Sequence, residues 1–73
     1  MRPDELKMIG QAFLPDHCKS KWRHEIARLT DYSERMVRYW HEQPARFPVP
    51  PLVEKVIRLE YRKLQRRQGR REE

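Results

Sequence analysis

Two arginines three positions apart, Arg35 and Arg38, carry the clearest chemistry of this sequence. Side chains at this spacing share one side of an α-helix, here a helix expected over residues 34–42. A guanidinium group donates two parallel hydrogen bonds to O6 and N7 of guanine. On the same helix, Glu34 can accept from cytosine N4, and Tyr39 can bond a phosphate or pack on a thymine methyl. We therefore expect all four side chains to contact DNA bases. The alternative is a solvated helix face with intrahelical ion pairs such as Glu34–Arg38.

A second helix must hold the arginine-bearing helix in place, and residues 20–30 predict it. Trp22, Ile26 and Leu29 recur at the spacing of an amphipathic helix. Ala27 lies beside them, and only a small side chain fits where two helices cross closely. Asp16 and Ser20 are both candidate caps for the start of this helix.

The connection between the two helices has the residues of a tight turn. Asp31 stands where the turn needs a positive φ, and aspartate is one of the few non-glycine residues that adopt it. Ser33 is the predicted N-cap of helix 34–42, because its hydroxyl can accept from a free N–H in the first turn. Val37 and Trp40 share the opposite side of that helix, where we expect them to anchor it.

Two further helices complete an all-α fold. Residues 3–13 begin with Pro3 and place Leu6, Ile9, Ala12 and Phe13 on one stripe. Residues 43–51 contain four prolines and must form a loop. A helix over 51–65 follows. We expect a small bundle of four to five helices, with a helix-turn-helix at about 20–42, in a single domain over 1–65. The basic end, 66–73, has no apolar residue and is predicted to be disordered.

Composition indicates a polyanionic partner and limits the sources of stability. The chain has 73 residues and a net charge of +6, and small basic domains commonly bind nucleic acid. Cys18 is the only cysteine, so no disulfide can form within the chain. The histidines and Cys18 do not have the spacing of a zinc site, so we expect no metal.

Several cations near the two-helix region are candidates for phosphate contacts. Such contacts set affinity and register rather than sequence choice. The N-terminus of a helix also binds phosphate through its free N–H groups. The expected phosphate-contacting residues are Ser33, Arg23, Lys21, Lys19 and Arg46.

The last helix has more apolar residues than the core of so small a monomer needs. This surplus predicts a homodimer interface formed by Val53, Val56, Ile57, Tyr61 and Leu64. The alternative is that the same face closes the core of the monomer. Similarly, the aromatic residues Phe13, Trp22, Trp40 and Phe47 fit a core better than a platform for stacking bases.

Residues 22–40 are similar to the helix-turn-helix of the Cro and lambda-repressor type. They most resemble short phage and bacterial regulators, including those associated with anti-CRISPR genes, which share a pattern W-x-x-x-[LI]-A-x-x-L-G-V-S-x-R-x-V-R-x-W. The chain departs from it at Thr30 and at Asp31-Tyr32, where Leu and Gly-Val are usual. The matching residues are Trp22, Ile26, Ala27, Ser33, Arg35, Val37, Arg38 and Trp40.

This resemblance implies a sequence-specific DNA-binding transcriptional regulator, in particular a repressor that binds a palindromic operator as a homodimer. Two other classes stay open: a protein-interaction module such as an antitoxin or inhibitor, and a non-specific nucleic-acid binder. We expect no enzyme, because no paired carboxylates, nucleophile–histidine arrangement or phosphate loop is present, and we expect no cofactor. No apolar run has the length of a signal core, so we expect a cytoplasmic protein.

Overall fold

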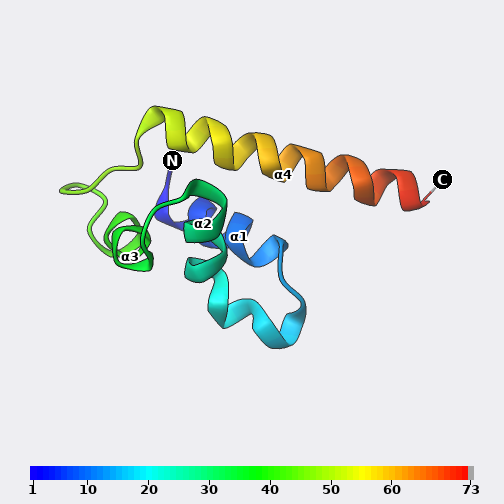
Figure 1. Cartoon of the computed structure of the whole chain (residues 1–73), viewed down its shortest axis with the longest axis horizontal. Coiled ribbons are helices and arrows are strands. Elements are labelled where there is room, and N and C mark those ends of the chain that lie inside the picture. The colour runs from blue at the N-terminus through cyan, green and yellow to red at the C-terminus, as the bar shows by residue number, and fades with distance from the viewer. Residues whose placement is uncertain (73) are drawn as a thin grey trace.

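The computed structural model describes the backbone of residues 1–72 and the side chains of residues 1–67. It confirms the all-α class, and no strand occurs in this part of the chain. Four α-helices and one short 3-10 helix follow one another (Figure 1). Their bounds are α1 Pro3–Ala12, the 3-10 helix η1 Asp16–Lys21, α2 Trp22–Thr30, α3 Glu34–Glu42 and α4 Pro51–Glu72.

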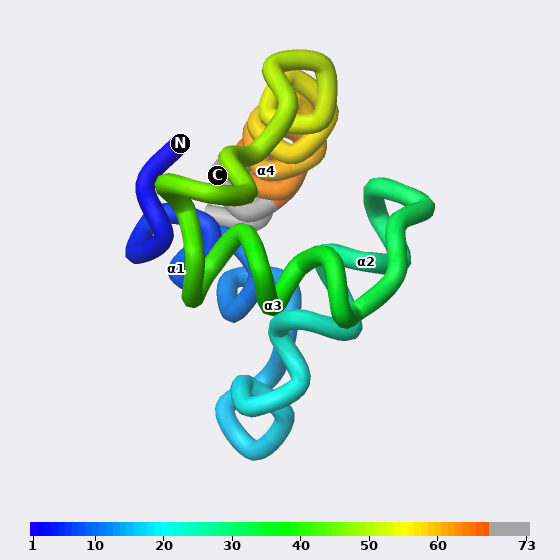
Figure 2. The backbone as a smooth tube through the Cα atoms, turned by 90° about the vertical axis from the view of Figure 1, so that its left-hand side faces the viewer, coloured from blue at the N-terminus to red at the C-terminus, as the bar shows by residue number. Residues whose placement is uncertain are grey.

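The core forms where α2 meets the other three α-helices. Each α-helix contributes two large apolar side chains to one cluster, and Ala27 of α2 is buried beside them. Figures 1 and 2 show α4 passing along one side of the three shorter helices. The eight large core residues are Leu6, Ile9, Trp22, Ile26, Val37, Trp40, Val53 and Ile57.

Gly10 allows α1 to lie directly against α2. A Cβ atom at this position would come within 3.0 Å of Cγ1 of Ile26, and within 3.1 Å of both Cβ and the backbone oxygen of Trp22. The glycine costs about 1 kcal/mol in helix propensity relative to alanine. Its absent side chain is what permits the close approach of these two helices.

The turn between α2 and α3 has the predicted geometry. Asp31 has φ 63° and ψ 24°, the left-handed conformation that lets α2 stop after Thr30. Ser33 then caps α3, since its Oγ accepts a hydrogen bond from the backbone N–H of Met36 at 3.2 Å. This cap satisfies one of the free amide groups at the start of α3.

The start of α2 differs from the prediction. The helix begins at Trp22 rather than at residue 20, and neither Asp16 nor Ser20 caps it. The preceding residues wind into η1, which Lys19 ties to the end of α1 by donating from Nζ to the backbone oxygen of Gln11 at 3.0 Å. The 3-10 helix ends at Lys21, immediately before Trp22, which is the first residue of α2 and is buried in the core.

The end of α4 also differs from the prediction. The helix continues to Glu72 instead of ending at residue 65, so the segment expected to be disordered is helical as far as Glu72, and Glu73 lies outside the described residues. Arginine, glutamine and glutamate are good helix formers, and no proline follows Pro51. Because no apolar residue follows Leu64, this part of α4 adds nothing to the core, but its residues still favour a helix.

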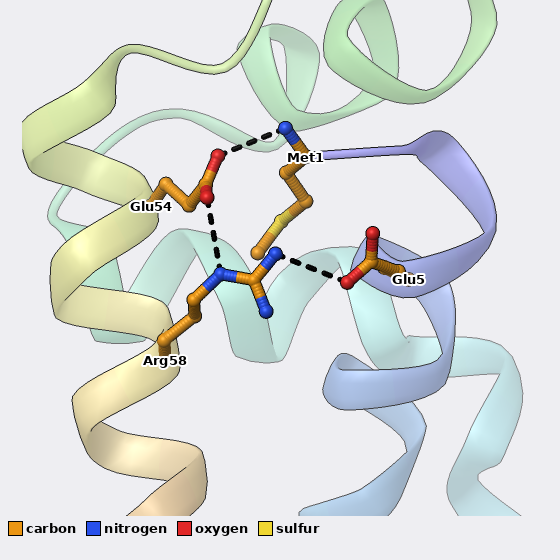
Figure 3. A network of polar contacts seen from close by, with 4 residues as sticks. All are labelled: Met1, Glu5, Glu54 and Arg58. Carbon is orange, nitrogen blue, oxygen red and sulfur yellow. Dashed lines mark hydrogen bonds and ion pairs between the residues drawn. The ribbon is translucent and has the colours of Figure 1, made fainter.

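A chain of ion pairs fastens the first half of α4 to the beginning of the chain (Figure 3). Glu54 accepts from the N-terminal ammonium group of Met1 at 2.8 Å and from Nε of Arg58 at 3.0 Å. Nη2 of Arg58 donates in turn to Glu5 of α1 at 3.0 Å. The Arg58 hydrogen bond lowers the pKa of Glu5, and the ammonium group followed by Arg58 lowers the pKa of Glu54.

Candidate nucleic-acid interface

An open groove lies between the start of α2 and the outward side of α3. We call it the α2–α3 groove. Its lining contains four cationic side chains and a histidine but a single carboxylate, so the groove is strongly basic. The lining residues are Ser20, Lys21, Arg23, His24, Glu34, Arg35 and Arg38.

The core determines which side of α3 faces this groove. Val37 and Trp40 are buried, so α3 is held by one side. Arg35 and Arg38 lie on the other side and are exposed to solvent, as the spacing predicted. The short turn after α2 and the Ser33 cap fix where this helix begins. The backbone therefore presents both guanidinium groups from one well-anchored helix.

The carboxylates near the groove are already engaged. Nδ1 of His24 lies 2.9 Å from Oε1 of Glu34, which joins the first turn of α2 to the first residue of α3. Glu42 lies 3.9 Å from Nη2 of Arg23 and 4.0 Å from Nε of Arg38. The intrahelical pair Glu34–Arg38, considered above as an alternative, does not form. Arg35 has no carboxylate within ion-pair distance among the side chains that the structure describes.

Aromatic rings extend the interface toward the proline loop. Tyr39 stacks on Phe47, with ring centroids 4.9 Å apart and an interplanar angle of 22°. The guanidinium of Arg38 lies 5.9 Å from the centre of the Tyr39 ring, and that of Arg46 lies 5.6 Å from the centre of the Phe47 ring. Phe47 thus covers one face of the Tyr39 ring.

The predicted phosphate contacts divide into two groups. Lys21 and Arg23 line the groove, whereas Lys19, Ser33 and Arg46 do not. Nζ of Lys19 is held by the backbone oxygens of Gln11 at 3.0 Å and Leu14 at 3.4 Å, so this lysine serves the fold. The hydroxyl oxygen of Ser33 accepts the hydrogen bond that caps α3, while its O–H remains able to donate.

Sequence reasoning missed Ser20 and His24 as members of the groove. His24 is ten positions before its partner Glu34, and no periodic pattern connects the two. The one available signal is its position next to Arg23 in the first turn of α2.

The five residues predicted for a dimer interface differ in their exposure, and two of them fit the alternative that this face closes the core of the monomer. Val53 and Ile57 are buried in the core of the monomer, because this side of α4 covers α1 and α2. Tyr61 and Leu64 are half-buried, and Val56 is 42 % exposed. Sequence reasoning missed Leu52 and Leu59, which are 75 % and 49 % exposed and lie on the same side of α4 as Val56.

The described residues form neither a metal site nor a membrane-spanning helix. They contain no group of three or more His, Cys, Asp or Glu side chains placed to hold a metal ion. No helix among them has the length and apolar character needed to cross a membrane. Comparisons with protein-family models, with curated proteins and with solved structures find no match to this chain. The arrangement of its own residues therefore carries the functional argument.

Proposed function

We propose that this protein is a sequence-specific DNA-binding transcriptional regulator that inserts α3 into the major groove. The observation that carries the proposal is the α2–α3 groove, where the end of η1 and two α-helices joined by a short turn bring Lys21, Arg23, Arg35 and Arg38 to one surface. Helix-turn-helix proteins of the Cro and lambda-repressor type use this arrangement, with the second helix reading base edges.

Each cation has a role that its position supports. Arg35 and Arg38 project from the exposed side of α3, where guanidinium groups can reach guanine O6 and N7. Lys21 and Arg23 come from the other wall of the groove, which favours contacts with the phosphates that border the same site. Binding at a promoter would repress transcription by occupying the DNA.

We propose further that the protein binds DNA as a homodimer on an inverted repeat. The support is the exposed apolar stripe of Leu52, Val56 and Leu59 on α4, which replaces the interface expected from the sequence. These residues lie at helical spacing on the side of α4 away from the core. A two-fold pair would place its two α3 helices on half-sites about one helical turn, or a multiple of it, apart.

The test begins with selection from a randomised duplex library at about 150 mM salt, where non-specific binding is weak. The expected product is an inverted repeat with a guanine in each half-site. Arg35→Ala and Arg38→Ala should each weaken binding to that duplex about 5- to 150-fold for each half-site, because each half-site loses the ~1–3 kcal/mol of one bidentate base contact. The thermal melt of both variants should stay near that of the wild type, because both side chains are exposed.

Lys7→Ala is the matched control, since Lys7 is an exposed cation of α1 that does not line the groove. It should bind the selected duplex with the affinity of the wild type. Failure to enrich any sequence, or equal affinities for all three variants, would refute sequence-specific recognition by α3.

A further inference from the structure

The second half of α4 extends beyond the body of the protein. The helix has 22 residues and is therefore about 33 Å long. Among its described side chains the buried ones, Val53 and Ile57, both lie in the first half, and Figure 1 shows the helix continuing past the shorter helices. We call residues 62–67 the α4 arm. It contains no buried residue.

The α4 arm carries cations in adjacent pairs that repeat every four residues. Arg62 and Lys63 form the first pair and Arg66 and Arg67 the second, and the sequence repeats the pair at 70–71. Four residues advance an α-helix by about 6 Å and slightly more than one turn, so successive pairs stay on one side of it. The result is a row of positive charge that runs along the helix at about 26° to its axis.

These cations are largely free of protein partners. Lys63 lies 3.5 Å from Glu60. For Arg62, Arg66 and Arg67, none of the carboxylates that the structure describes is within ion-pair distance. Arg58 differs sharply, although it is only one turn earlier on the same helix, because Glu5 and Glu54 both hold it.

We infer that the α4 arm is a second nucleic-acid surface, which binds the phosphate backbone of a duplex without regard to sequence. A regular row of free guanidinium groups matches the regular charge of a phosphate backbone. A membrane surface fits less well, because Leu64 is the single apolar residue of the arm and an interfacial helix needs an apolar face. A protein partner fits less well for the same reason, since the centre of a protein interface is depleted in charge.

This inference concerns residues outside the α2–α3 groove and does not require that α3 read bases. Its effect would be to raise affinity for any duplex and to make that affinity more dependent on salt. Each phosphate neutralised on B-DNA contributes about −0.9 to the slope of log K against log salt.

The experiment compares two triple variants of the full chain that lose the same charge. The arm variant is R62Q/R66Q/R67Q. The control variant is R2Q/K7Q/K55Q, which changes three exposed cations elsewhere. Glutamine preserves helix propensity, so both variants should keep the helical content of the wild type by circular dichroism. Binding to a random-sequence duplex is measured by fluorescence anisotropy between 50 and 200 mM salt.

The arm variant should show a salt slope shallower than the wild type by about 2.7, which is three phosphate contacts. Over this fourfold range of salt, its affinity should therefore fall about 40-fold less than that of the wild type. The control variant should keep the wild-type slope. An unchanged slope in the arm variant, or an equal change in both variants, would overturn the inference, the second because it would reflect net charge alone.

The double variant R35A/R38A separates this inference from the proposed function. Two results together support both the proposed function and the α4 arm. R35A/R38A should lose sequence preference, and removal of the arm cations should still make the salt slope shallower by the same amount. If no sequence preference exists in the wild type but the arm variant still shows the shallower slope, the proposed function fails and the α4 arm stands.

Discussion

The α2–α3 groove and the α4 arm are both basic surfaces, but they hold their charges in different ways. In the groove, Glu42 lies near Arg23 and Arg38, and His24 holds Glu34. In the arm, Arg62, Arg66 and Arg67 have no such partner among the described side chains. A guanidinium group that a carboxylate helps to position, as Glu42 does for Arg38, suits recognition of a particular base, whereas free ones suit attraction to any phosphate. Arg35 has no such partner among the described side chains and is positioned by α3 alone. Positive charge can therefore serve two purposes, which the surrounding contacts and the supporting helix distinguish.

The two surfaces also differ in how the core supports them. The groove is built on two helices that bury Trp22, Ile26, Val37 and Trp40. The arm is the end of one helix, which buries Val53 and Ile57 several residues earlier. Rigid elements hold the geometry that specific contacts need, and electrostatic attraction to a backbone tolerates motion.

The largest effect should distinguish the two sides of α4. Ile57→Ala removes a fully buried side chain and should lower the free energy of unfolding by about 2–5 kcal/mol. Leu59→Ala, on the exposed side, should change it by less than about 0.5 kcal/mol in the monomer. Urea unfolding followed by circular dichroism measures both. Equal losses at a protein concentration where sedimentation shows a monomer would contradict the burial of Ile57 and the exposure of Leu59.

A smaller effect should reveal how far the groove depends on the start of α3. Ser33→Ala removes the hydrogen bond to the N–H of Met36 and should cost about 1 kcal/mol of stability. Ser33→Asp, which retains an acceptor at the cap, should keep most of that stability. If α3 is positioned by its cap, Ser33→Ala should also weaken sequence-specific binding while leaving the salt slope of random duplex binding intact. If Ser33→Ala is as stable as the wild type, the cap does not contribute to the stability of the protein.

Much of the α2–α3 motif was predictable because its determinants are local. The bounds 34–42 of α3 are confirmed, as are the Ser33 cap and the left-handed Asp31. Each depends on residues within a few positions of one another. Helical periodicity also identified Val37 and Trp40 as the buried side of α3, which by itself directs Arg35 and Arg38 outward.

The errors arose where distant segments determine the outcome. The pairing of His24 with Glu34 depends on how two helices cross, and the burial of Ile57 depends on where α4 lies against α1 and α2. Helix propensity marks Gly10 only as an unfavourable residue within α1, whereas its value is the space it leaves for Ile26. The end of α4 was misplaced because the absence of apolar residues was taken to end the helix, although that absence affects packing and not propensity.

The smallest expected effect concerns Arg58, whose ion pairs hold α4 against the beginning of the chain. Glu5 and Glu54 have pKa values below that of a free glutamate, in both cases partly through Arg58. A carboxylate with a lowered pKa stabilises the fold above its unfolded pKa, and this stability is lost as the pH falls through the folded pKa. Thermal stability should therefore decline below about pH 4.5, the ordinary range of glutamate. Arg58→Gln should make that decline shallower, because much of the difference between folded and unfolded pKa disappears.

Arg62→Gln is the matched control, because it removes the same kind of charge one turn later on the same helix. Arg62 has no described carboxylate to influence, so this variant should lose stability in acid as steeply as the wild type. Melting temperatures between pH 7 and pH 3 test the contrast. If Arg58→Gln and Arg62→Gln respond alike, the ion pairs of Figure 3 do not fasten α4 to the body. The distinction between Arg58 as a structural arginine and Arg62 as a free one would then be wrong.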